Sequence, residues 1–365
     1  MTWRAVALLL GLAALASAQV PPPASAAIAA GPLGSVQAGG VISALGVWQD
    51  RPAPGEAGTL ADWSNAMVIL QKASGPVQFY LQAGAYNIPV VGQSLQSTGD
   101  TTRGLFGLLP VVYATFPLGA HCSLDAGVLP TLIGAENTFT FQNVNVLRGL
   151  LWNQENDVNR GIQVNAARGR WKGAVSWNDG YYSDRFTWIS ADVAYTLSAT
   201  QSLLLTGGGN WSRTAYRTAA TPVQNNSRIL DLIYSYSHGP WMVEPYFQFS
   251  DVPAAEVAAI AHGAQTWGGA LLASRKLPGH FSLAVRAEFI RATGSPPKES
   301  VNLLYGPGSG AWSWTVTPGW QPQHFFVRGD LSLVNAIRPA AGDAFGRAGN
   351  DRNQFRAALE TGFAF

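Results

Sequence analysis

The stretch that decides the fold is Val77-Gln78-Phe79-Tyr80-Leu81-Gln82-Ala83-Gly84-Ala85-Tyr86, in which apolar and polar residues alternate. A β-strand places successive side chains on opposite faces, so the odd-numbered residues share one face and most polar residues share the other. The same period of two recurs in residues 281–289 and 325–333. One face of such a strand suits lipid and the other suits water.

Connections between these stretches alternate between short and long along the whole chain, which predicts an antiparallel up-and-down transmembrane β-barrel of about 16 strands. Fourteen and eighteen strands stay open as alternatives, because strand boundaries are uncertain by a few residues. Short turns on the periplasmic side and long loops on the outer side are typical of bacterial outer-membrane barrels, and both termini then fall on the periplasmic side. The short connections lie near Ala73–Pro76, Pro117–Ala120, Gly169, Ser198–Gln201, His238–Pro240, Arg275–Gly279 and Pro318–Pro322. The longer polar ones lie near Asp50–Ala61, Pro89–Arg103, Gly134–Asn159, Asn178–Arg185, Arg213–Asn226, Asp251–Ala264, Thr293–Ser309 and Arg338–Asp351.

Composition is consistent with a membrane barrel and excludes several other classes. Charged residues make up 12% of the 365 residues, against about 25% in a soluble globular domain. Lys and Arg number 23 against 21 Asp and Glu, so nothing indicates a nucleic-acid partner. A soluble β-sandwich or propeller would also be rich in glycine, so composition alone leaves that alternative open. Cys122 is the single cysteine, which excludes an intrachain disulfide and a cysteine-rich metal site.

The N-terminus has the features of an export signal. Arg4 precedes a short apolar stretch, and Ala16-Ser17-Ala18 gives a small-x-small cleavage pattern. The apolar stretch is too short for a membrane anchor and is soon followed by three prolines. We therefore expect a signal peptide over residues 1–18, a periplasmic linker over 19–32 and an outer-membrane barrel over 33–365.

The last strand and the tryptophans also favour a barrel in the outer membrane. The final strand ends in Phe365 and resembles the signal that the barrel-assembly machinery reads, although Glu360 stands where glycine is commonest. Phe355, Ala357, Leu359, Thr361, Phe363 and Phe365 lie on its apolar face, and Arg356, Glu360 and Gly362 lie on the other. Indole suits the bilayer interface, so tryptophans near strand ends predict an aromatic girdle. The tryptophans in question are Trp48, Trp171, Trp188, Trp211, Trp241, Trp267 and Trp320.

The segment from Ala126 to Ala167 resembles the β-barrel porin-2, or OmpL-like, family. The resemblance is carried by Gly127–Glu136, Asn145–Trp152 and Arg160–Val164, with Asn143 and Arg148 standing where the family tends to place Asn and Arg. The sequence departs from the family pattern where Ser-Arg-Ser and His-Thr-Gly are usual. The resemblance implies an outer-membrane channel and leaves the transported solute open.

The third long loop, near Gly134–Asn159, is the candidate site. The third loop of general porins folds toward the lumen, and this one looks similar. We hypothesise that it narrows the pore, and that its charges face an arginine cluster on the late strands to create a transverse field. The alternative, equally supported, is that the wall charges simply pair with one another. The predicted constriction residues are Glu136, Arg148, Glu155, Asp157, Arg286, Glu288, Arg328, Asp330 and Arg356, with Glu360 on the same wall.

No catalytic motif stands out, and we predict no catalytic residue, metal or cofactor. The expected function is passive diffusion of small hydrophilic solutes and ions, with polar wall residues such as Gln78, Tyr80, Gln82, Gln163, Asn165 and Gln248 contacting them. Two alternatives stay open: a sugar-type selective channel that uses Tyr80, Tyr86 and Trp152 for stacking, and a structural or adhesive barrel with a blocked lumen. The expected partners are outer-membrane lipid, the barrel-assembly machinery and small hydrophilic solutes. A homotrimer is expected only by analogy with sixteen-stranded porins.

Overall fold

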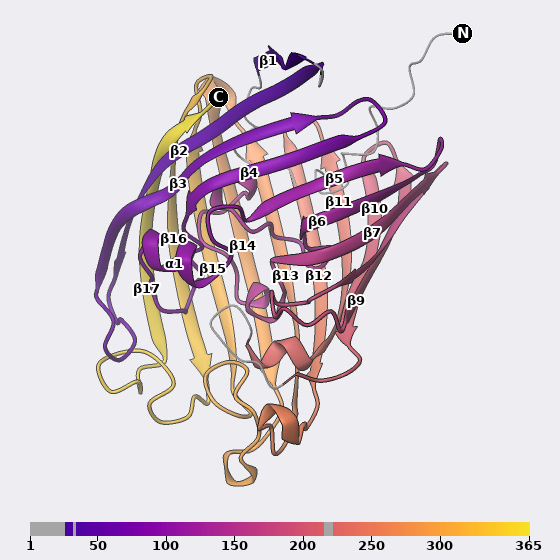
Figure 1. Ribbon diagram of the computed structural model, residues 1–365. Coiled ribbons are helices and arrows are strands. Elements are labelled where there is room, and N and C mark those ends of the chain that lie inside the picture. Colours follow the sequence, from indigo (N-terminus) through magenta and orange to yellow (C-terminus); the bar gives the residue numbers. More distant parts are fainter. Residues whose placement is uncertain (1–25, 32–33, 215–221) are drawn as a thin grey trace.

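Strands dominate the computed structural model, which describes residues 26–31, 34–214 and 222–365 (Figure 1). The predicted signal peptide lies outside the described residues. Within the predicted linker, Ala26–Ala29 forms a short strand, β1, that pairs with Ser35–Ala38. In the described part of the chain, no helix is long and apolar enough to cross a bilayer.

Sixteen further strands follow β1 along the chain. They are β2 (Ser35–Gln49), β3 (Thr59–Lys72), β4 (Gln78–Tyr86), β5 (Val111–Pro117), β6 (Cys122–Pro130), β7 (Val158–Arg168), β8 (Trp171–Asn178), β9 (Trp188–Ser198), β10 (Gln201–Asn210), β11 (Arg228–His238), β12 (Trp241–Val252), β13 (Ala264–Lys276), β14 (Phe281–Ala292), β15 (Gly310–Trp320), β16 (Phe325–Ile337) and β17 (Asn353–Ala364). The one α-helix among the described residues is α1 (Thr98–Gly104). Short 3-10 helices span Thr140–Gln142, Leu151–Gln154, Val223–Asn226, Glu256–Ala258, Pro278–His280 and Pro296–Lys298.

The strands β2 to β17 close into one antiparallel barrel. Each pairs with its neighbour in the chain, and β17 pairs with β2 through a register that includes Leu359 opposite Gly46. Closure leaves no free sheet edge, which satisfies the backbone hydrogen bonds in a medium without water. The predicted architecture is therefore confirmed. Figure 1 places the long loops at the lower end of the barrel, and β1 and the C-terminus at the upper end.

The alternation of side chains along each strand is also as predicted. On β14, Phe281 and Phe289 are exposed on the outer surface, whereas Arg286 is 1% exposed. On β17, Leu359 and Phe363 are exposed, whereas Glu360 is fully buried. The outer surface is thus largely apolar, and the charged residues predicted for the lumen side of the late strands, such as Arg286 and Glu360, point into the barrel.

One tryptophan does not belong to the girdle. Trp48, Trp171, Trp211, Trp241, Trp267 and Trp320 are exposed, but the prediction for Trp188 is wrong because this residue is 0% exposed. It packs inside the barrel with Ile133 and Ile229, and its ring contacts Tyr181 edge-on at 5.6 Å. The reason is register: Ile189 points outward, so the preceding side chain must point inward.

Candidate functional site in the barrel lumen

The long connection between β6 and β7, residues 131–157, lies inside the barrel. Its Leu147 N–H donates to Asp330 Oδ2 on β16 at 2.8 Å, and Asn145 Nδ2 donates to Thr317 Oγ1 on β15 at 2.6 Å. Further along, Gln154 Nε2 donates to the carbonyl of Leu303 at 3.0 Å. Asp330 and Thr317 belong to the buried inner faces of their strands, so these bonds hold the loop against the inner wall. We call residues 131–157 the lumen loop.

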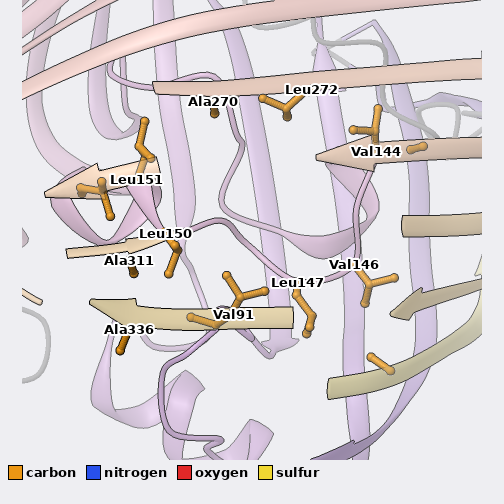
Figure 2. Packing of buried hydrophobic residues seen from close by; sticks show 14 of the residues in the cluster. Val91, Val144, Val146, Leu147, Leu150, Leu151, Ala270, Leu272, Ala311 and Ala336 are labelled. Atoms are coloured by element: carbon orange, nitrogen blue, oxygen red, sulfur yellow. The ribbon is translucent and has the colours of Figure 1, made fainter. Parts of the chain in front are cut away.

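Apolar side chains attach the lumen loop to the same wall. Val144, Val146, Leu147, Leu150 and Leu151 are all buried in one cluster with inward-facing residues of the strands β11 to β17. Figure 2 shows these loop residues beside Ala270, Leu272, Ala311 and Ala336, with Val91 from the preceding long loop among them. Burying a leucine or valine side chain stabilises by roughly 1.5–3 kcal/mol, so this contact contributes strongly to docking. Part of the lumen is therefore filled by protein.

Arg286 joins the wall to the lumen loop. Its Nη1 donates to Glu136 Oε1 and to the carbonyl of Leu147, each at 2.7 Å, and its Nε donates to Glu288 Oε2 at 3.1 Å. All three charged side chains are at most 1% exposed. The loop carboxylate and the wall arginine thus meet in a direct buried ion pair.

Arg328 and Arg356 bind the loops through backbone carbonyls. Arg328 Nη1 donates to the carbonyl of Asn143 at 2.7 Å, and its Nη2 pairs with Glu360, which stands directly opposite on β17. Arg356 Nη1 donates to the carbonyl of Val90 at 2.6 Å. A buried guanidinium needs several acceptors, and here loop carbonyls supply part of them. The two arginines therefore hold the long loops in place.

The remaining predicted residues are buried within the lumen loop or beside it. Arg148 is fully buried and donates to four carbonyls of its own loop at 2.8–3.2 Å. Glu155 Oε1 accepts from Gln248 Nε2 at 2.7 Å. Burial, followed by the nearby Asp231 charge, raises the pKa of Glu155 well above its usual range, and burial does the same for Asp157. Most of the predicted residues thus bond to protein groups in or beside the lumen loop, whereas Arg356 contacts the preceding long loop.

An open space of ≈ 1060 Å³ lies along the inner face of the early and middle strands. It extends from the short turns at Ser74–Pro76 and Gly119–Ala120 to residues 129–137 at the start of the lumen loop. We call it the lumen cavity. Its wall includes Gln78, Gln163 and Asn165, which the sequence pattern placed on the water-facing side. It also includes three carboxylates that the sequence analysis did not single out, Asp125, Asp192 and Glu244.

Comparison with known proteins decides the family. The family model described as "Putative beta-barrel porin-2, OmpL-like" matches residues 35–365. The chain belongs to this porin family. The match confirms the resemblance seen in residues 126–167, and the family and fold together identify an outer-membrane channel protein.

Solved structures show the same fold as this porin. An anion-selective porin from Comamonas acidovorans aligns with a TM-score of 0.63 and 12% identity, covering 91% of this chain and 99% of that chain. OmpF of Salmonella typhi, in complex with daunomycin, aligns with a TM-score of 0.62 and 9% identity, covering 91% of this chain and 98% of that chain. The channel DcaP of Acinetobacter baumannii aligns with a TM-score of 0.60 and 8% identity, covering 91% of this chain and 97% of that chain. No curated protein matches the sequence. At these identities the likeness shows the fold alone.

The aromatic residues expected to stack sugars lie differently in this porin. Tyr86 is fully buried against Phe106 and Phe139, and Trp152 is also buried. Tyr80 stacks on Tyr113 with ring centroids 5.7 Å apart. Of these side chains, Tyr113 lines the lumen cavity. Among the described residues, the wall of the lumen cavity therefore has no run of exposed aromatic rings.

Proposed function

We propose that this porin lets small hydrophilic solutes and ions diffuse passively across the outer membrane, through the part of the lumen that the lumen loop leaves open. The observation that carries the proposal is the lumen cavity of ≈ 1060 Å³ with amide and carboxylate side chains on its wall. Gln163, Asn165 and Asp125 form a hydrogen-bonded row along it, at 2.7 and 2.8 Å. Charged and amide groups at a cavity surface favour water inside it.

Passive diffusion needs weak, exchangeable contacts and no chemical step. The wall groups bond to one another and keep further lone pairs for passing solutes, which fits release as well as entry. The sugar-type alternative has less support, because Tyr86 and Trp152 are buried. The blocked-lumen alternative has support from the apolar cluster around the lumen loop. A transport measurement separates them.

Liposome swelling tests the proposal. Vesicles containing the folded porin are diluted into isotonic solutions of neutral sugars of increasing size, and vesicles with the same mass of denatured protein serve as the control. We expect fast swelling with monosaccharides that declines with trisaccharides, because the cavity admits small solutes. Swelling no faster than the control for every sugar would favour the blocked-lumen alternative.

We further propose that residues 1–18 export the chain and that the assembly machinery recognises β17 through its outward aromatic side chains and Phe365. Removal of the terminal ring, as Phe365→Ala, is expected to lower the amount of folded barrel in cells, because the recognition signal is lost. Refolding of the same variant into detergent should be unchanged. Equal amounts of variant and wild-type barrel in cells would contradict this role.

We also propose that the porin forms a homotrimer, which the mass of the detergent-solubilised protein tests.

A further inference from the structure

We propose that this porin selects for cations, and that Asp125 on β6, Asp192 on β9 and Glu244 on β12 set this preference from the wall of the lumen cavity. The inference rests on the proposed channel function and names the class of solute that the channel favours. It also moves charge selectivity away from the arginine-rich wall on which the sequence analysis placed it.

Neutral donors hold the three carboxylates. Asp125 accepts from Thr115 Oγ1 at 2.6 Å and from Asn165 Nδ2 at 2.8 Å. Asp192 Oδ1 accepts from the Ala174 N–H at 2.6 Å. Glu244 Oε2 accepts from the Ser235 hydroxyl at 2.6 Å. Hydroxyl and amide donors orient a carboxylate and leave its negative charge uncompensated.

Among the described residues, the lining of the lumen cavity holds no cationic side chain. None of the ion pairs among them includes Asp125, Asp192 or Glu244. The described side chains that line the cavity include no lysine, arginine or histidine. Lys172 lies near the periplasmic end of the same wall, opposite Ala194 in the strand register, and is not among the lining residues.

The opposite wall does not offset this charge. Arg286 is paired with Glu136 and Glu288, and Arg328 is paired with Glu360, all buried. Glu136, the fourth carboxylate at the cavity, is buried and paired with Arg286. A solute in the cavity therefore meets three carboxylates without a cationic partner, while Arg286 and Arg328 are buried in ion pairs. Clefts lined by one sign of charge concentrate counter-ions.

Coulomb's law gives the expected size of the effect. One carboxylate about 10 Å from an ion in water raises the local concentration of a monovalent cation about twofold and lowers that of an anion about twofold, so three change the cation-to-anion ratio about 64-fold before screening. Salt at about 0.1 M reduces this, because the Debye length is then about 10 Å. We therefore expect potassium to be favoured over chloride by about two- to eightfold.

The first test is the reversal potential across a planar bilayer with a KCl gradient, at alkaline pH so that carboxyl groups are ionised. The wild type should favour potassium. The triple variant Asp125→Asn, Asp192→Asn, Glu244→Gln should lose most of this preference, because the wall becomes neutral. A matched control, Asp100→Asn, Glu299→Gln, Asp343→Asn, removes the same charge from exposed positions outside the barrel strands and should keep the preference for potassium. A wild type that favours chloride, or a triple variant with unchanged selectivity, would overturn the inference.

A second test does not depend on conduction. A thiol is placed beside Asp192 as Ala194→Cys, in a Cys122→Ser, Lys172→Gln background that removes the cation opposite position 194, with and without the triple change. Its modification by a cationic and an anionic methanethiosulfonate is timed in detergent, each rate being divided by that of a free thiol. We expect the cationic reagent to be favoured severalfold and the triple change to remove the preference. Equal normalised rates would overturn the inference, whereas absence of conductance with this preference intact would overturn only the proposed channel function.

Discussion

Substituting Arg286 by methionine should loosen the lumen loop without opening the barrel wall. The guanidinium of Arg286 binds Glu136 and the Leu147 carbonyl on the loop, and Glu288 and Thr315 on the wall. Methionine fills much of the same volume and supplies no donor. Two carboxylates then stay buried without their cation, while every backbone bond between β14 and its neighbouring strands is kept.

The magnitude follows from the burial of this ion pair. Removal of one partner of a buried pair costs about 3–5 kcal/mol, since the other charge is left uncompensated. Such a change shifts the balance between docked and undocked loop by roughly a hundredfold to several thousandfold. The apolar contacts of Val144 to Leu151 oppose full release. We therefore expect local fluctuation of the loop near Glu136 and an intact barrel.

Single-channel recording measures this loosening. Arg286→Met should show a larger mean conductance and more open-channel noise than the wild type. Adding Glu136→Gln should reverse part of the effect, because it replaces the unpaired carboxylate of the lumen loop by a neutral amide. The effects of the two substitutions on conductance should therefore be clearly non-additive. Glu136→Gln alone should have the smaller effect, since Arg286 keeps Glu288. Conductance and noise of Arg286→Met equal to those of the wild type would refute the reasoning.

Three further predictions concern pH, packing and backbone geometry. Burial raises the pKa of Glu155, so docking of the lumen loop should be strongest below the usual glutamate pKa of about 4.3 and weaken as pH rises toward the raised value. Glu155→Gln should flatten this part of the curve of conductance against pH, and an unchanged curve would contradict the prediction. Trp188→Ala should lower the free energy of unfolding by about 3–5 kcal/mol through the cavity it leaves, measured in denaturant, whereas the exposed Trp211→Ala should cost much less. Gly127→Ala should destabilise the barrel by more than about 1–3 kcal/mol, because φ of Gly127 is +144° and a Cβ would lie 2.2 Å from the Val112 carbonyl oxygen. Gly46→Ala should be tolerated, because a Cβ there meets open space. Equal thermal stability of the two variants would count against the stated geometry.

Local sequence pattern was sufficient for the barrel wall. In β14 the alternation of Phe281, Leu283 and Val285 with polar neighbours determines which side faces lipid, because a strand has only two faces. The long and short connections then set the strand count. The prediction for Trp188 was wrong because a position near a strand end does not specify whether the side chain faces lipid or the lumen. Its outward neighbour Ile189 carries the signal that would have placed it inside.

The interior was less predictable, because its contacts join distant parts of the chain. The sequence indicated that Glu136 and Arg286 belong to one region, but the two are 150 residues apart, and periodicity does not reveal a direct pair. The apolar residues Val144 to Leu151 were present in a segment treated as polar, and an apolar run in a long loop is the signal for docking. Asp125 and Asp192 lie between small residues on inward positions, and only the closed barrel brings them to one cavity.

The central claim is that a barrel partly filled by its own loop still holds a water-filled path for ions. Single-channel recording of the purified wild-type porin in a planar bilayer tests it most directly, with folding verified by the heat-dependent shift in gel mobility. The account predicts discrete, reproducible conductance steps with ohmic current. Insertion of folded barrels without any conductance step would contradict it.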